Sequence, residues 1–267
     1  VEWGVPAAQD ALEVIGTQNL NAVEHFYGDA MQAVSGCLRS LFVAAPGHDL
    51  ICSDYSSIEA VVLAVLSGEQ WRIDVFRTHG KIYEMSAAKI TGTSFESMLE
   101  HKKTTGQHHP LRKLGKVAEL ASGYGGGLGS WVQFGAGEFL PEEEIKTAIR
   151  AWRAASPKIV ELWGGQERNW QPELFGVEGA FITAMHYPGQ EFFVRGLRFQ
   201  KRGDAVYIRL PSGRELTYHR PRMEPSADRP GTSQISFEGW NSNPLNGPVG
   251  WTRIRTYSGR LVENCVQ

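Results

Sequence analysis

Apolar residues recur at helical spacing through the first two thirds of the chain. Residues 8–40 carry this spacing and are predicted to be mostly helical. A second apolar stripe, spaced i, i+3, i+4, i+7 and i+8, predicts a helix that ends at Ser67-Gly68. The stripe consists of Ile58, Val61, Val62, Val65 and Leu66.

Three further segments are predicted to be helical. Residues 71–90 form one helical pattern that closes at Gly92. A helix is expected over residues 110–122, because proline suits a first helical turn and the glycine-rich run 123–129 would stop it. Residues 141–163 read as one or two helices that begin with three glutamates, which suit a helix N-terminus.

Two regions carry strand signals. Residues 205–210 and 214–218 flank the turn sequence Pro211-Ser212-Gly213 and predict a β-hairpin. Residues 48–54 follow the turn signal Pro46-Gly47 and predict a strand that leads into the apolar helix.

The remaining third is less regular in pattern. Residues 220–231 are rich in proline and are expected to be irregular. A last helix is expected from about Thr256, and its apolar pattern is still running at Gln267. Together these elements predict a mixed α/β (α+β) protein.

Composition places the chain among globular proteins. Its 267 residues include 42% apolar and 21% charged residues, which is ordinary for such proteins. Its three cysteines are widely spaced, which fits a reducing cytoplasm better than a disulfide framework. The longest apolar run, residues 60–66, is far shorter than the roughly 20 residues of a membrane helix, so no membrane partner is expected.

Positive charge is concentrated in two stretches although the net charge is −2. Residues 101–116 hold five Lys or Arg residues, three histidines and no acid, and residues 195–229 hold a second basic group. Segregated charge of this kind can attract a polyanion. The alternative is that both stretches are solvated faces with no ligand.

Residues 54–59 combine a predicted strand end with a helix start. A carboxylate there, Asp54, is well placed to hold Mg²⁺, which favours one or two protein carboxylates together with substrate phosphates. Glu59 lies five residues further on, in the first helical turn. The alternative for Ser56-x-x-Glu59 is a capping box with no catalytic role.

The predicted helix 110–122 carries a second candidate site. Arg112 and Lys116 are four residues apart and share a helix face, where two cations without a facing acid would suit a triphosphate. Leu120 and Tyr124 extend that side as an apolar surface. The glycines that follow match no phosphate-binding loop and read as a helix stop.

Together the two segments resemble motifs of family A DNA polymerases. Residues 54–59 (DYSSIE) match the palm motif "DYSxIE", and residues 112–125 match the fingers motif "RxxxKxxxxxxxYG". KVAEL at 116–120, GYGGG at 123–127 and GEQWR at 68–72 are similar to the phage subfamily. Shorter matches, in the same order, include residues 26–29, 38–42, 151–153, 210–214 and 257–264.

The resemblance implies a polymerase palm with a mainly helical fingers subdomain and a β-hairpin. Residues 1–66 would be a partial palm with the first catalytic motif, 67–235 the fingers, and 236–267 a segment that returns to the palm and starts a palm helix. The implied activity is template-directed DNA synthesis by a phage protein in the cytoplasm of its bacterial host. The implied partners are primer-template DNA and a dNTP.

The resemblance also implies roles for single residues. Asp54 and the carbonyl of Tyr55 would bind metal in a two-Mg²⁺ site, and Glu59 would exclude a ribose 2′-hydroxyl. Lys116 would also be a candidate proton donor to pyrophosphate. The implied nucleotide contacts are Tyr55, Glu59, Tyr83, Arg112, Lys116, Leu120 and Tyr124, and the implied DNA contacts are Arg39, Asn264 and Gln267.

The sequence departs from the family in three places. Val61 stands where arginine is usual, and Lys81 replaces an acid. No His-Asp-Glu triplet occurs, since His48-Asp49 is followed by leucine, and in the family this triplet supplies the second metal-binding aspartate. The prediction is that a second polypeptide or a further segment supplies it, because one carboxylate cannot hold two metal ions.

Two other classes of function stay open from the sequence. One is a catalytically inactive DNA- or nucleotide-binding module with an inert Asp54 site. The other is an unrelated metal-dependent phosphohydrolase that uses Asp54 and Glu59, although no further Asp/His cluster is visible.

Overall fold

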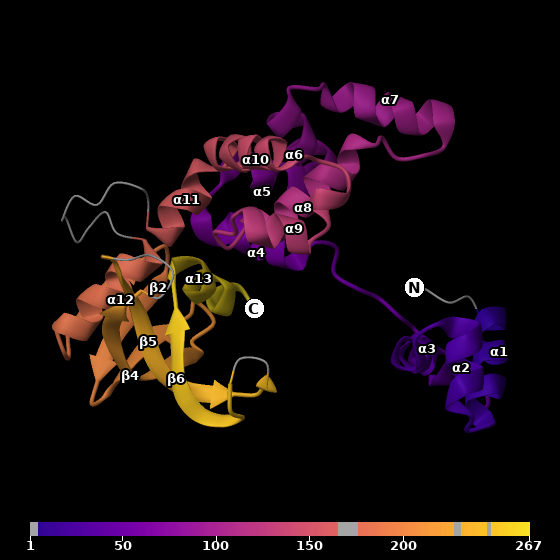
Figure 1. The fold of residues 1–267 in the computed structure, drawn as a ribbon. Helices are drawn as coiled ribbons and strands as arrows, with labels where there is room; N and C mark the ends of the chain where they lie inside the picture. Colours follow the sequence, from indigo (N-terminus) through magenta and orange to yellow (C-terminus); the bar gives the residue numbers. More distant parts are fainter. Residues whose placement is uncertain (1–4, 165–175, 227–230, 245–246) are drawn as a thin grey trace. The chain divides into compact units, whose positions relative to one another are not determined.

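A computed structural model describes residues 5–164, 176–226, 231–244 and 247–267 (Figure 1). The chain divides into two compact units, Val1–Tyr55 and Ser56–Gln267. The boundary falls inside the segment that resembles the palm motif, so Asp54 and Tyr55 belong to the first unit and Glu59 to the second.

The first unit is helical through residue 41, as its apolar spacing predicted. Its second and third helices begin at polar caps, for example where the Asp29 side chain accepts a hydrogen bond from the Gln32 backbone N–H at 2.8 Å. Ala8, Ala11 and Cys37 form a small buried cluster. The elements are α1 (Val5–Gly16), α2 (Leu20–Tyr27), α3 (Ala30–Cys37) and the 3₁₀ helix η1 (Leu38–Leu41).

The prediction of a strand over residues 48–54 is wrong. This segment has no regular secondary structure. A strand needs a neighbouring strand for its backbone hydrogen bonds, and the described part of the first unit offers none. The apolar side chains that suggested a strand, Leu50 and Ile51, are exposed instead.

Helices form the first part of the second unit, and their ends follow glycine and proline signals. Residues 71–90 form two helices instead of the one predicted, because Gly80 adopts a left-handed φ of 67° between them. The helix at 110–122 and the pair within 141–163 are confirmed. The helices are α4 (Ile58–Ser67), α5 (Gln70–Thr78), α6 (Ile82–Thr91), α7 (Phe95–Thr105), α8 (Leu111–Ser122), α9 (Leu128–Gln133), η2 (Ala136–Glu138), α10 (Glu142–Ala155) and α11 (Pro157–Trp163).

Helix α4 ends at Gly68 as predicted, but the predicted stripe is not its buried face. Leu63, Ala64 and Ser67 are buried, whereas Ile58 and Val65 are exposed. The helix is apolar on nearly all sides, so spacing alone did not identify the face that packs.

A six-stranded antiparallel sheet in the order β1-β2-β3-β4-β5-β6 follows the helices. The predicted hairpin is β3 and β4, but residues 220–225, expected to be irregular, continue β4. The strand tolerates Pro221 because the pairing shifts between His219 and Arg222. The strands are β1 (Glu191–Val194), β2 (Leu197–Arg202), β3 (Ala205–Arg209), β4 (Glu215–Pro225), β5 (Ser233–Asn241) and β6 (Gly250–Thr256).

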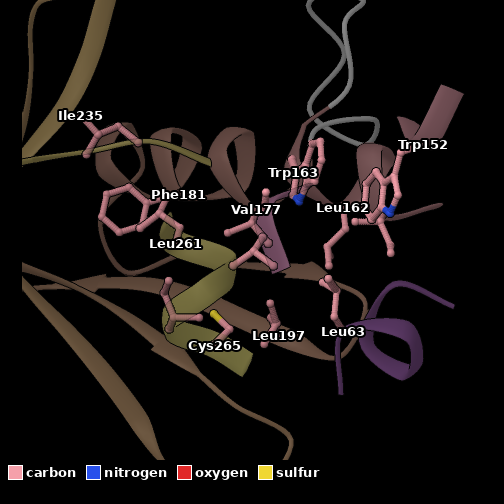
Figure 2. Packing of buried hydrophobic residues seen from close by; sticks show 14 of the residues in the cluster. Leu63, Trp152, Leu162, Trp163, Val177, Phe181, Leu197, Ile235, Leu261 and Cys265 are labelled. Atoms are coloured by element: carbon pink, nitrogen blue, oxygen red, sulfur yellow. The ribbon is translucent and has the colours of Figure 1, made fainter. Parts of the chain in front are cut away.

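One apolar core joins the helices and the sheet of the second unit (Figure 2). Helices α12 (Val177–His186) and α13 (Ser258–Val266) contribute to it, the latter close to the predicted last helix. Trp152 and Trp163 stack with ring centroids 6.2 Å apart. The structure confirms the predicted mixed α/β class, and no helix in the described ranges has the length and apolar character needed to cross a bilayer.

A buried ion pair links three of the helices in this core. Arg72 on α5 pairs with Glu119 on α8, and both side chains are almost inaccessible to solvent. Glu119 also accepts a hydrogen bond from Trp152 Nε1 at 3.0 Å, and Arg72 Nη2 donates to Ser156 Oγ at 2.9 Å. Three segments that resemble the polymerase family therefore meet in one network, namely residues 68–72, 116–120 and 151–153.

Candidate nucleotide site

Helix α8 presents its two predicted cations differently. Lys116 is exposed, and among the described residues it has no acidic partner. Lys113, one turn earlier, is exposed too, but its Nζ lies 3.0 Å from Glu138 Oε2. Lys116 is therefore an uncompensated positive charge on a helix that the core holds in place.

The expectation that no acid faces Arg112 and Lys116 is wrong for Arg112. Its Nε donates a hydrogen bond to Oε1 of Glu84 on α6 at 2.9 Å. His108 Nδ1 lies 3.6 Å from the same oxygen, and Glu84 is buried. The Arg112 guanidinium also lies over the Tyr83 ring, 5.0 Å from its centroid. Sequence spacing did not reveal Glu84, because its contact with Arg112 crosses from one helix to another.

These residues line a small pocket of about 160 Å³. Arg112, Lys81 and Lys102 give it positive charge, and His108 and His109 add two further nitrogen donors. Glu84 is the acid among the lining residues. A pocket with this balance suits a phosphate-containing ligand, which guanidinium and ammonium groups bind by charge-assisted hydrogen bonds.

Close packing of α6 against α8 positions the pocket walls. Gly115 on α8 lies so near the Tyr83 carbonyl that an added Cβ would be 1.9 Å from its oxygen. Any larger residue would push the two helices apart. Glycine here therefore sets the distance between Tyr83 and Arg112.

Glu59 and Tyr124 form a second cluster. Tyr124 OH donates a hydrogen bond to Glu59 Oε2 at 3.3 Å, and Gln267 Nε2 lies 3.5 Å from Glu59 Oε1. Burial, followed by the negative charge of Glu59, raises the pKa of Tyr124 above its ordinary range, so it stays a neutral hydrogen-bond donor. The predicted positions Glu59, Tyr124 and Gln267 are thus brought together.

The C-terminal helix α13 approaches this cluster through a glycine. A Cβ on Gly259 would lie 1.8 Å from the Tyr124 carbonyl oxygen, so only glycine allows the contact. Asn264 on α13 is half-buried, and its Nδ2 donates to Tyr218 OH at 2.9 Å. Leu120 is partly exposed on α8.

The other predicted site residues lie in the first unit. Asp54 and Tyr55 follow one another in a segment without regular structure, and Tyr55 is 79% exposed. Arg39 lies on η1 and is also exposed. Within the described ranges, no three His, Cys, Asp or Glu side chains come together to hold a metal ion.

The chain is similar to known DNA polymerases. It is 40% identical to a DNA polymerase of Bacillus phage SP02 over 247 residues, which are 92% of this chain and 34% of the phage protein. It is 41% identical to DNA polymerase I of Treponema pallidum over 61 residues, 23% of this chain and 6% of that protein. A DNA polymerase of Mycobacterium phage D29 is 31% identical over 90 residues, 34% of this chain and 13% of that protein.

These similarities confirm the resemblance that the two motifs predicted, to a phage-type family A DNA polymerase fragment. The chain spans about a third of the length of the SP02 relative. No protein-family profile matches the chain. No solved structure matches it either.

Proposed function

We propose that this chain is the palm-and-fingers part of a DNA polymerase that transfers a nucleotidyl group from a dNTP to a primer 3′-hydroxyl. Residues 1–66 and 236–267 would belong to the palm and residues 67–235 to the fingers. The similarity over 92% of the chain supports the proposal. The observation that carries it is the uncompensated Lys116 on a rigid helix one turn from Arg112.

In this proposal the fingers residues bind the incoming nucleotide. Arg112 and Lys116 hold the triphosphate, Tyr83 supports Arg112, and Leu120 packs against the nucleotide. Glu59, held by Tyr124, acts as a steric gate that excludes the 2′-hydroxyl of a ribonucleotide, because its side chain takes the space that the extra oxygen would need. Lys116 would also donate a proton to the leaving pyrophosphate.

The catalytic metal site is proposed to be shared with residues outside this sequence. The Asp54 carboxylate and the Tyr55 carbonyl supply oxygen ligands of the kind that Mg²⁺ prefers. Bound Mg²⁺ would activate the primer hydroxyl and stabilise negative charge on the phosphates. The second carboxylate would come from a partner polypeptide or further segment with a His-Asp-Glu triplet, and the complex would work in the host cytoplasm.

Three residues are proposed to contact DNA. Arg39 would contact the primer end, and Asn264 and Gln267 would reach the minor groove of the primer-template duplex. Asn264 already donates to Tyr218, so a DNA contact would use its remaining amide groups.

Primer extension tests the proposal. The chain alone is compared with the chain plus a polypeptide that carries a His-Asp-Glu segment, with Mg²⁺ and four dNTPs. We expect extension in the mixture and its loss with Asp54→Ala. Lys116→Ala should weaken dNTP use at least tenfold, whereas Lys113→Ala, whose lysine is paired with Glu138, should change it little.

The alternative function is a nucleotide-binding module without catalysis. It is favoured by one observation, namely that Asp54 stands in an exposed segment without regular structure. dNTP binding that depends on Lys116, with no extension in the mixture, would support this alternative over the polymerase. Hydrolysis of dNTP without primer would instead support a phosphohydrolase.

A further inference from the structure

The two faces of the six-stranded sheet differ in chemistry. One face is apolar and buried, with Leu197, Phe199, Val206, Ile208 and Ile235 in the core. Strand alternation places their neighbours on the opposite face. That face holds Arg198, Arg202, Tyr207, Arg209, His219, Arg222, Glu238, Trp240, Trp251, Arg253 and Arg255.

Two tryptophans lie side by side on this second face. Trp240 on β5 and Trp251 on β6 are direct cross-strand partners, and they are 60% and 65% exposed. Directly opposed residues have Cβ atoms about 5 Å apart, so the two exposed indoles start from neighbouring positions on this face, and together they are called the aromatic surface. His219 on β4 extends it, with its ring centroid 5.7 Å from that of Trp251. The fold does not bury these rings, so packing of the described core does not explain them.

Arginines lie further along the same strands. Arg220 and Arg253 share Glu238, at 3.0 Å and 3.1 Å, and Arg220 also reaches Asp204 at 3.2 Å. Arg222 pairs with Glu224 at 2.5 Å. Arg255 is exposed and has no acidic partner in the described part of the chain. This region therefore holds four guanidinium groups and three carboxylates, so one positive charge on the strands is not balanced.

We propose that this face of β4, β5 and β6 binds a single-stranded polynucleotide, whose bases stack on Trp240 and Trp251 while Arg255 and its neighbours contact the phosphates. Flat exposed aromatic rings among arginines match a strand whose bases are free to stack. A duplex fits less well, because its bases already stack on one another. The inference goes beyond the proposed nucleotide site, since none of these residues lines the pocket around Arg112.

Fluorescence anisotropy with a labelled oligo(dT) of about 12 nucleotides tests the proposal. The doubly substituted Trp240→Ala/Trp251→Ala chain should bind at least tenfold more weakly than the unaltered chain. Trp240→Phe/Trp251→Phe should recover much of the affinity, because phenylalanine also stacks. Arg255→Ala should lower the slope of log affinity against log salt by about 0.7.

Matched controls locate the effect on the sheet. Phe134→Ala removes an exposed aromatic ring directly after α9, and Arg77→Ala removes an exposed arginine from α5, and neither should change oligo(dT) binding. Lys116→Ala should not change it either, which separates this surface from the proposed dNTP site. Failure of primer extension would therefore leave this test unaffected.

Three results would overturn the proposal. The first is that the unaltered chain fails to bind oligo(dT), and the second is that the double alanine variant binds it as well as the unaltered chain. The third is that sedimentation shows a dimer that the tryptophan substitutions break, with oligo(dT) binding unchanged. The face would then be an interface between copies of the chain.

Discussion

The two segments that resemble polymerase motifs differ sharply in how the chain supports them. Helix α8 has seven buried residues, and its Glu119 is tied to Arg72 and Trp152. The segment around Asp54 has no regular structure, and Ile51 is 94% exposed. Both motifs are equally clear in the sequence.

The difference shows that a motif specifies chemistry but not the structure that holds it. Helix α8 draws its support from α5, α6 and α10, through contacts that join residues 28 to 47 positions apart. The Asp54 segment has no strand partner in the described part of its unit. We therefore expect the proposed nucleotide site on α8 to be formed in the isolated chain, and the proposed metal ligands Asp54 and Tyr55 to need added contacts.

Breaking the Arg72–Glu119 pair should have the largest effect on stability. Glu119→Ala would leave the Arg72 charge buried without its partner, which costs about 3–5 kcal/mol of unfolding free energy. Urea denaturation measures it. Arg72→Met/Glu119→Met should lose less than the sum of the single changes, and Lys146→Ala, at an exposed ion pair, should cost far less than Glu119→Ala. If Glu119→Ala lowered the unfolding free energy no more than Lys146→Ala does, the buried Arg72–Glu119 pair would not be important for stability.

The reactivities of Cys52 in the first unit and Cys265 in the second provide a direct comparison of the two units. Burial raises the pKa of Cys265 on α13 to about 12, whereas Cys52, beside Asp54, is exposed. Only the thiolate reacts, so at pH 8 iodoacetamide should label the buried Cys265 much more slowly than the exposed Cys52. Labelling followed by peptide mass spectrometry checks this. Equal labelling rates in the native chain would mean that α13 is not docked.

A glycine substitution tests the spacing of α6 and α8. Gly115→Ala would place a Cβ against the Tyr83 carbonyl, and the resulting shift should cost about 1–3 kcal/mol. It should also weaken dNTP binding, because Tyr83 and Arg112 move apart. Gly129→Ala on α9 meets nothing within 4 Å, so it should be neutral or slightly stabilising. Thermal unfolding of the two variants would show whether they differ.

Asp54→Ala should have the smallest effect on stability. The side chain is exposed in a segment without regular structure, so the unfolding free energy should change by no more than about 0.5 kcal/mol. Loss of primer extension in the complemented polymerase should nevertheless be complete. A large loss of stability would show that Asp54 has a structural role in the first unit.

Local signals in the sequence predicted much of the helical part. Gly68, Gly92 and Pro110 marked helix ends where the structure has them. Helix α7 was not predicted, although Ser94 and Gly106 cap it and were visible signals. The continuation of β4 past Pro221 was missed because a bulge depends on the pairing partner.

Contacts between distant segments could not be read from spacing. The shared face of Arg112 and Lys116 follows from their separation of four residues, but Glu84 lies 28 residues away from Arg112 on another helix. Likewise the meeting of Glu59 with Gln267 joins residues 208 positions apart. Such pairings depend on tertiary packing, which a single sequence does not display.

Glu84 has a further consequence for how Arg112 could receive a ligand. The carboxylate holds only Nε, and no described acid occupies the two terminal nitrogens. The guanidinium is therefore oriented in advance, and a bound phosphate would not have to displace Glu84. Immobilising a free side chain on binding costs about 0.5–1.5 kcal/mol. Because Glu84 already orders the Arg112 side chain in the folded protein, this cost would not reduce the affinity for a ligand. A lysine in place of Arg112 would lose this advantage, because its single ammonium group could not bind Glu84 and a phosphate through separate nitrogens.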